Sequence, residues 1–296
     1  MRAVPAILLA ALAAPPAGAA TLSVSPSSAR PGDVVLVSVE GAEVAPSGTL
    51  AGRTLAFWGA GGKWHALAPL PLETPVGTAS AEVLAGEPLA AGLEVVEPAF
   101  RSTTLSVPPR FVEPPPRAKR RIAADRKAFK EAFDRPFEPP RFDGPFDWPR
   151  RADSTGRFGD RRTFNGKQAS VHYGLDLDGP VGAPVLSSNG GTVVLTRDCY
   201  MSGRTVVLWH GAGVFSLYFH LSEIEVAAGQ TVGRGDLVGR VGATGRVTGP
   251  HLHWSVKVDG LYVDPESILR IDPTAAAAPE AAPGTDAPPG TDPGPR

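Results

Sequence analysis

The feature that most restricts the fold is the density of glycine and proline along the chain. Among the 296 residues there are 34 glycines and 32 prolines, while hydrophobic residues make up 42%. Because both residues interrupt helices and favour turns, a helical bundle is excluded and short strands joined by turns are favoured. The apolar content suffices for a buried core, and the length suggests two modules with appendages. We therefore expect a mainly β protein.

Residues 1–20 have the pattern of a secretory signal peptide. Arg2 supplies a positive charge, residues 6–14 are apolar, and residues 17–19 (Ala-Gly-Ala) fit the small residues of a cleavage site. The apolar stretch is shorter than the about 20 residues that a membrane span needs. No later segment reaches that length without charges, so we expect no transmembrane segment. The sequence predicts an exported protein, periplasmic or secreted and associated with the cell envelope.

Residues 21–112 are predicted to form a β-sandwich-like domain. Leu22 and Val24 alternate with serines, and residues 34–39 form a second apolar, β-branched run. Clusters of proline and glycine separate these runs, and residues 103–107 continue the pattern near the end of the domain. Regularly spaced short strands of this kind are typical of a sandwich.

Isolated residues carry weaker signals. His65 has no second ligand nearby, so a packed or surface histidine is expected there rather than a metal ligand. A carbohydrate-binding role of the front domain is compatible with the sequence, but only Trp58 and Trp64 could form an aromatic platform. The single cysteine, Cys199, excludes an internal disulfide and any cysteine-based zinc knuckle. It is expected to be a packing residue, the alternative being an intermolecular bridge.

Residues 113–145 are predicted to be a Pro-rich linker with one basic amphipathic helix. Residues 118–133 place Phe129 and Phe133 on one stripe, and prolines then end the helix. Residues 117–130 carry seven basic side chains and one acid. Such a run is usually a solvated helix face, and the alternative is attraction to an anionic envelope polymer or membrane surface. The net charge of the whole chain is −1, which argues against nucleic acid as a partner.

Residues 146–272 form a second strand-rich module, and the Ala/Pro/Gly-rich tail at 273–296 is disordered by composition. We expect no convincing helix in this module. Its clearest strand candidates are residues 193–196, 205–209, 215–219 and 252–258.

Five of the six histidines lie in this second module. His251 and His253 are two residues apart in a strand-like run, so their side chains should share one face. The side chains of His172 and Asp176 would also point to one face if that stretch is extended. Zinc favours imidazole and carboxylate, and a catalytic zinc keeps three protein ligands and one water. Each pair alone is a weak signal, whereas the joint pattern favours a metal site.

Three motifs in the second module read VHYGLD at 171–176, YFHLS at 218–222 and GATGRVTGPHLHW at 242–254. In these motifs the sequence resembles the lysostaphin/LytM-type zinc metallopeptidases, peptidase family M23. The intervening residues 226–236 fit as well, as do RRTFNG at 161–166 and VDP at 263–265, and the resemblance covers about residues 158–269. The front domain resembles the β-rich N-terminal module of some exported members much more loosely.

This resemblance implies an antiparallel β-sheet catalytic domain of the LytM/M23 type that holds one Zn²⁺ per chain. It implies zinc ligation by His172, Asp176 and His253, and catalytic roles for His220 and His251. The implied function is zinc-dependent hydrolysis of peptide cross-links of bacterial peptidoglycan in cell-wall remodelling, so that peptidoglycan peptides are the expected partner. The scissile bond stays open between D-Ala–diaminopimelate, a stem-peptide bond and a glycine bridge.

Alternative functions are weighed against the same residues. A non-catalytic wall-binding or amidase-activating module on the same fold is disfavoured because all five site positions are filled. A lipoyl- or biotinyl-like carrier needs a lysine at a hairpin tip, and neither Lys167 nor Lys257 is suitably placed. His210 falls outside the motifs and is expected to be structural. A further hypothesis is that the front domain or the linker covers the groove and restrains activity.

Overall fold

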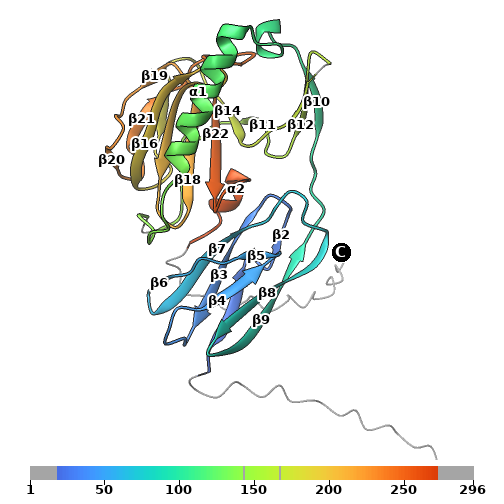
Figure 1. Ribbon diagram of the computed structural model, residues 1–296, viewed down its shortest axis with the longest axis vertical. Coiled ribbons are helices and arrows are strands. Elements are labelled where there is room, and N and C mark those ends of the chain that lie inside the picture. The colour runs from blue at the N-terminus through green and yellow to red at the C-terminus, as the bar shows by residue number, and fades with distance from the viewer. Residues whose placement is uncertain (1–18, 143, 167, 273–296) are drawn as a thin grey trace, which may run out of the picture.

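The computed structural model describes residues 19–142, 144–166 and 168–272, which build five β-sheets and two α-helices (Figure 1). The mainly β fold class is confirmed. The predicted signal peptide lies outside the described residues except for its last two alanines, and the C-terminal tail lies outside them entirely. No described helix is long and apolar enough to cross a membrane.

The front of the chain forms two sheets that face each other. Their spatial orders are β1-β3-β7-β6 and β2-β9-β8-β4-β5. The first sheet comprises β1 (Thr21–Ser25), β3 (Val34–Glu40), β7 (Lys63–Pro69) and β6 (Trp58–Ala60). The second comprises β2 (Ser28–Ala29), β9 (Glu87–Val95), β8 (Gly77–Ala85), β4 (Ser47–Leu50) and β5 (Arg53–Thr54).

Strand β3 is buried on both faces. Val35, Val37 and Val39 belong to the core between the two front sheets. The alternate residues Val34 and Leu36 pack into the core of the second module. Because successive side chains of a strand point to opposite faces, residues of this one strand pack into two different cores. Trp58 also packs there and is only 3% exposed, so it cannot form the surface platform considered for carbohydrate.

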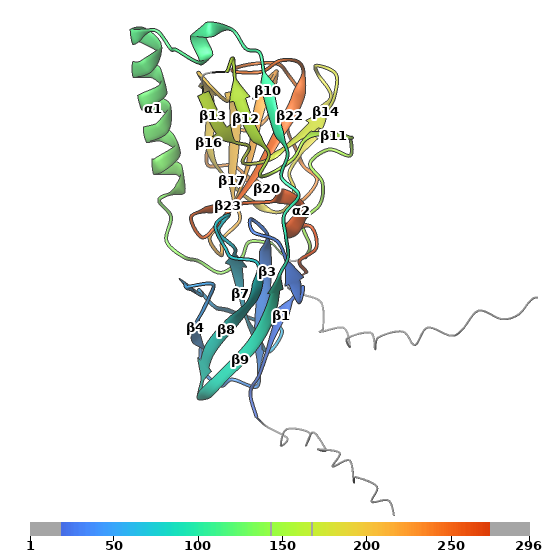
Figure 2. The same cartoon turned by 90° about the vertical axis from the view of Figure 1, so that its right-hand side faces the viewer.

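The strand predicted near residues 103–107 does not join the front sandwich. It forms β10 (Ser102–Leu105), which runs parallel to β12 (Arg161–Phe164) of the second module, with Thr103 opposite Arg162 (Figure 2). Strand β12 then pairs with β13 (Gln168–Val171) in the same small sheet. Residue alternation identifies a strand but not its partner, which explains why the sequence placed this segment in the wrong sheet.

A 3₁₀ turn (Pro109–Phe111) precedes the predicted linker, and helix α1 (Pro116–Phe133) lies within the linker, which confirms the predicted helix. The helix lies along the outer face of the large sheet (Figure 2), where Phe133 contacts the ring of Phe215 at 5.2 Å between centroids. Asp125 is buried on the same side and accepts hydrogen bonds from Arg197 Nε and the Tyr200 amide. The apolar face of the helix is thereby covered and most of its basic side chains face solvent.

The second module is organised around one large antiparallel sheet with the spatial order β11-β14-β22-β18-β17-β16-β20, and β23 pairs with β22. These strands are β11 (Ser154–Gly156), β14 (Leu175–Asp178), β22 (His251–Val258), β18 (Val214–Leu221), β17 (Gly203–Trp209), β16 (Gly191–Cys199), β20 (Thr231–Val232) and β23 (Leu261–Val263). A small sheet contains β15 (Pro184–Leu186), β21 (Leu237–Arg240) and β19 (Glu223–Ile224). The strand predictions in this module are confirmed.

A four-residue helix, α2 (Pro265–Ile268), was not expected in this module. Asp264 caps its first turn by accepting a hydrogen bond from the Glu266 amide, and Pro265 supplies a favourable first helical residue. The Asp264 amide donates to the carbonyl oxygen of Gly32 at 2.7 Å, and Ser267 Oγ accepts from the Val34 amide. The helix therefore lies where the two modules meet, and its apolar period is too short to be recognised in the sequence.

Candidate metal centre

Two neighbouring strands bring the central side chains of the site together. Asp176 on β14 lies opposite His253 on β22 in the antiparallel register. The alternate residues Leu252 and Trp254 are fully buried on the other face, so His251 and His253 do share a face, as the spacing predicted. His172 follows β13 directly, and the tight connection through Gly174 returns the chain to Asp176. A Cβ on Gly174 would lie 2.7 Å from His253 Nε2.

The donor atoms of His172, Asp176 and His253 lie within 4.8 Å of one another. His172 Nε2 is 3.0 Å from Asp176 Oδ1 and 2.9 Å from His253 Nδ1. His253 Nδ1 is 2.8 Å from the same carboxylate oxygen. All three side chains are less than about one-eighth exposed. These are two imidazoles and one carboxylate in a compact triangle, which is a donor set for a metal ion.

The remaining ring nitrogens fix which atoms of the histidines face the triangle. His172 Nδ1 donates to the carbonyl oxygen of Arg157 at 2.8 Å, which leaves a lone pair on Nε2. Ser255 Oγ donates to the carbonyl oxygen of Tyr173, so it accepts from His253 Nε2 and leaves the lone pair on Nδ1. Partners of this kind orient ligating histidines and fix their tautomers.

The charges at the triangle suit a cation. Burial alone would raise the pKa of Asp176, but its close contacts with His172 and His253 outweigh burial and hold this pKa well below the usual range. Asp176 Oδ2 also accepts from Arg162 Nη2 at 2.7 Å. Burial lowers the pKa of His253 to about 4. At neutral pH the triangle therefore contains an ionised carboxylate and a neutral imidazole at His253.

His220 and His251 form a second pair beside the triangle, with ring centroids 5.1 Å apart. His220 has a positive φ of 63°, and its Nδ1 donates to the carbonyl oxygen of Thr244 at 2.8 Å. His251 Nδ1 donates to the carbonyl oxygen of Gly249 at 3.0 Å. Each ring therefore keeps a lone pair on Nε2. Burial, followed by the charges of His253 and His251, lowers the pKa of His220 to about 3, so its ring is neutral.

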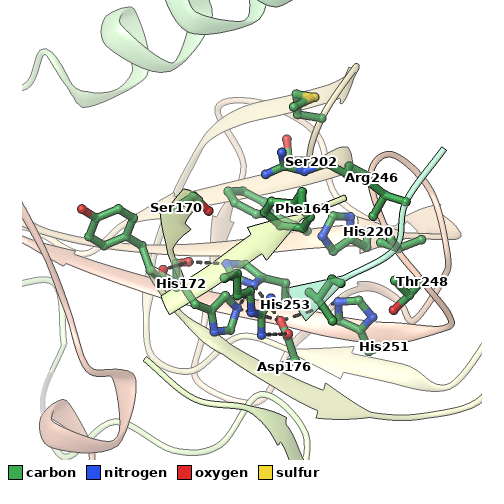
Figure 3. A pocket seen from close by; sticks show the side chains of 18 of the residues that line it. Phe164, Ser170, His172, Asp176, Ser202, His220, Arg246, Thr248, His251 and His253 are labelled. Carbon is green, nitrogen blue, oxygen red and sulfur yellow. Dashed lines mark hydrogen bonds and ion pairs between the residues drawn. The ribbon is translucent and has the colours of Figure 1, made fainter. Parts of the chain in front are cut away.

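All five side chains line one groove of about 430 Å³ (Figure 3). Sequence reasoning missed several other residues that line it. Arg162 and Phe164 lay within a quoted motif but had no assigned role, and Arg246 and Thr248 were treated only as part of the loop before His251. Leu105 of β10 also reaches the groove. Its sequence gives no signal for this, because the contact depends on the pairing of β10 with β12.

The other singled-out polar residues lie elsewhere. His210 is fully buried, donates from Nδ1 to the carbonyl oxygen of Gly190 and is 2.7 Å from Ser216 Oγ, which agrees with a structural histidine. His65 is buried and lies 2.9 Å from Ser38 Oγ. Cys199 is buried and free, and burial raises the pKa of its thiol, as expected of a packing residue.

The structure is similar over most of its length to a Pseudomonas aeruginosa protein assigned to peptidase M23. The two chains are 30% identical with a TM-score of 0.60, and the match covers 81% of this chain and 94% of the other. The chain belongs to peptidase family M23. The family profile itself matches residues 170–265, which include all five residues of the groove assigned from the sequence.

Two curated relatives of this M23 chain each match about one-third of it. Peptidoglycan DD-endopeptidase ShyA of Vibrio cholerae is 46% identical over 98 residues, which are 33% of this chain and 23% of the relative. DD-carboxypeptidase/endopeptidase Mpg of Neisseria meningitidis is 40% identical over 98 residues, with the same shares. The match thus spans less than a quarter of the length of either relative.

Proposed function

We propose that this M23 protein is a zinc-dependent endopeptidase that hydrolyses peptide cross-links of bacterial peptidoglycan. The observation that carries the proposal is the convergence of five side chains in one groove, three as a metal-binding triangle and two as a pair of histidines beside it. The names of the two curated relatives, a peptidoglycan DD-endopeptidase and a DD-carboxypeptidase/endopeptidase, support the substrate class.

The three residues of the triangle fit Zn²⁺. Tetrahedral zinc with ligands at about 2.0 Å holds them about 3.3 Å apart, and the three donor atoms here are 2.8–3.0 Å apart. His172 Nε2, Asp176 Oδ1 and His253 Nδ1 would hold the ion. Three protein ligands leave a fourth position, which is typical of catalytic rather than structural zinc sites. When bound, zinc supplies a Lewis acid that makes a water more acidic and polarises a carbonyl group.

His220 and His251 are proposed as the catalytic histidines. Each ring is oriented by a backbone carbonyl oxygen at Nδ1 and keeps Nε2 free to accept a proton from the attacking water. The same nitrogen can return that proton to the leaving amine. Once protonated, an imidazole adjacent to the reacting carbonyl also stabilises the negative charge that develops on its oxygen. The positions of both rings are fixed before substrate binds.

The location and division of the chain are also proposals. The pattern of residues 1–20 supports export to the periplasm or the medium, where an enzyme of this kind would meet the wall. Residues 21–112 would be the front domain, apart from the strand at 102–105 that pairs with the second module. Residues 113–145 would be the linker, 146–272 the catalytic domain and 273–296 the tail.

Two histidine variants separate metal binding from catalysis. We expect the wild-type chain with zinc to release monomeric fragments from cross-linked sacculi, as read by mass spectrometry. His220→Ala should keep about one zinc per chain and lose cleavage by about 10²–10⁴-fold. His253→Ala should lose both zinc and cleavage. If wild type binds sacculi and releases nothing, the non-catalytic alternative is favoured. If His220→Ala cleaves at the wild-type rate, the role of that residue is refuted.

A restraint on the groove is proposed from the segment that leaves the front sandwich before the linker. Leu105 and Val107 line the groove, and Asn165 holds them there. The Asn165 side chain accepts from the Val107 amide at 2.9 Å and donates to the Val107 carbonyl oxygen at 2.8 Å. Its φ is 51°, so glycine can take its place without backbone strain.

Replacement of Asn165 by glycine tests this restraint without deleting a domain. Asn165→Gly removes both side-chain hydrogen bonds and should raise turnover on soluble muropeptide dimers. Asn165→Asp keeps the acceptor for the Val107 amide and should have a smaller effect. Unchanged or lower turnover in a folded Asn165→Gly protein would count against the restraint and would make this segment a fixed wall of the groove.

A further inference from the structure

Arg246 occupies a fixed position in the groove. Its amide donates to the carbonyl oxygen of Met201 at 2.7 Å, which ties the loop before β22 to the turn between β16 and β17. The preceding Gly245 has a φ of 80°, and a Cβ there would lie 2.4 Å from the Gly203 amide nitrogen. Figure 3 shows Arg246 at the end of the groove that holds His220 and Thr248, away from Ser170 and His172. The backbone at Arg246 is therefore held in place.

The guanidinium group of Arg246 is partly buried without an anionic partner. It lies over the Phe164 ring, 4.3 Å from its centroid. Nη1 is buried and has no hydrogen-bond partner among the described residues. Burial, and then the charge of Arg162, lower the pKa of Arg246, as expected for a cation that lacks a counter-charge. A buried cation without a counter-charge costs free energy. Because Arg246 also lines the groove, an acceptor bound in the groove could pair with its guanidinium group.

The acid already present in the groove cannot supply that acceptor. Asp176 Oδ2 accepts a hydrogen bond from Arg162 at 2.7 Å, and Asp176 Oδ1 is in contact with His172 and His253. No ion pair is formed by Arg246 among the described residues, whereas Arg162 has its own. The groove thus contains two arginines with different surroundings. Arg162 holds the carboxylate of the proposed metal ligand Asp176 in place, whereas Arg246 has no ion pair among the described residues.

We propose that Arg246 binds a free carboxylate of the substrate that lies next to the scissile amide. Guanidinium groups pair with carboxylates in a planar, two-point geometry, and stacking on Phe164 orients the group for such a pair. The inference rests on the proposed function and narrows it. A peptide cross-link through diaminopimelate carries a free carboxylate beside the bond, whereas a glycine bridge carries none. The groove is therefore selective for acidic, carboxylate-bearing cross-links.

The test compares the cleavage of two substrates by wild type and by two Arg246 variants. The substrates are a diaminopimelate cross-linked peptide dimer and the same dimer with the carboxylates beside the scissile bond converted to carboxamides. A charged hydrogen bond of ordinary strength predicts that wild type prefers the carboxylate by about 10–100-fold in kcat/KM. Arg246→Gln should lose most of this preference, chiefly by slower cleavage of the carboxylate substrate. Arg246→Lys should keep part of it.

Controls separate substrate recognition from loss of structure. Arg126→Gln makes the same change of charge on the exposed side of α1 and should leave the preference unchanged. Zinc content and melting temperature should be the same in Arg246→Gln and wild type. Equal cleavage of both substrates by wild type would overturn the inference and leave the proposed function intact.

A separate outcome tests the proposed function. If wild type cleaves neither peptide, that function fails, and binding of the same two peptides then tests Arg246. Tighter binding of the carboxylate by wild type but not by Arg246→Gln would support its role, and equal binding would overturn it.

Discussion

The loop before His251 contains a glycine whose replacement should damage catalysis more than folding. A Cβ on Gly242 would lie 2.2 Å from the Ser222 amide nitrogen and 2.6 Å from the His220 carbonyl oxygen. Ordinary van der Waals contact begins near 3.4 Å, so the two backbone segments must separate by about 1 Å. Gly242 also accepts a hydrogen bond from the His251 amide at 3.2 Å. The separation therefore shifts both proposed catalytic histidines relative to each other.

The expected magnitude follows from this displacement. A misplacement of about 1 Å in a catalytic constellation costs about 10²-fold in rate, while overpacking costs about 1–3 kcal/mol of stability. Gly242→Ala should therefore reduce kcat on a cross-linked muropeptide about 100-fold. His172 and Asp176 are untouched, so the variant should still bind about one zinc per chain. The measurements are steady-state kinetics, zinc content and the free energy of unfolding from urea titration.

Gly249, in the same loop, is the matched control. A Cβ there would meet nothing within 4 Å, so Gly249→Ala should stay within about twofold of wild-type kcat. Wild-type kcat in Gly242→Ala would refute the reasoning, because the steric conflict would then be absorbed without moving the histidines. An equal loss in both variants would also refute it, since the effect would not depend on the close approach.

Three further predictions concern stability. Asp125→Ala leaves the Tyr200 amide and the Arg197 side chain without their acceptor. It should lower the free energy of unfolding, measured by urea titration, by about 2–3 kcal/mol. No change would mean that water replaces the carboxylate. Burial raises the pKa of Asp264 to about 6, so the folded state binds this proton more tightly than the unfolded chain, and stability should fall as pH rises from about 4 to about 6. Asp264→Asn keeps an acceptor for the Glu266 amide and should raise the melting temperature at pH 7 while flattening this pH dependence; an unchanged pH profile would show that another group titrates. Removal of zinc by a chelator should abolish cleavage and lower the melting temperature, and added zinc should restore both. A melting temperature that does not change with the chelator would argue against a metal that binds the folded state.

The parts of the site that follow from local periodicity could be predicted from the sequence. His251 and His253 share a face because a strand alternates its side chains, and that alternation is visible in the sequence around them. The family was recognised from motifs, and the similarity to an M23 structure confirms it. The assigned roles of the five groove residues stay predictions, although the structure brings their side chains together.

The parts that depend on distant backbone pairing could not be predicted. Alternation in residues 103–107 indicates a strand equally well in either module, and only the parallel ladder with β12 decides its place. The unpaired charge of Arg246 becomes visible only once Phe164 and the surrounding loops are in position. The glycines of the 242–249 loop look alike in the sequence, whereas their surroundings differ between a backbone contact at Gly242 and open space at Gly249.

The front of the chain is linked through Arg162 to the triangle of His172, Asp176 and His253 that is proposed to bind the metal. The two carboxylate oxygens of Asp176 have different partners. Oδ1 contacts His172 and His253, and Oδ2 accepts a hydrogen bond from Arg162. A carboxylate held in this way presents a single oxygen to a metal, because its other oxygen is already occupied. Arg162 lies on β12, directly opposite Thr103 of β10. The strand that leaves the front sandwich therefore supports the strand that orients the Asp176 carboxylate, and loss of β10 would loosen a ligand as well as open the groove.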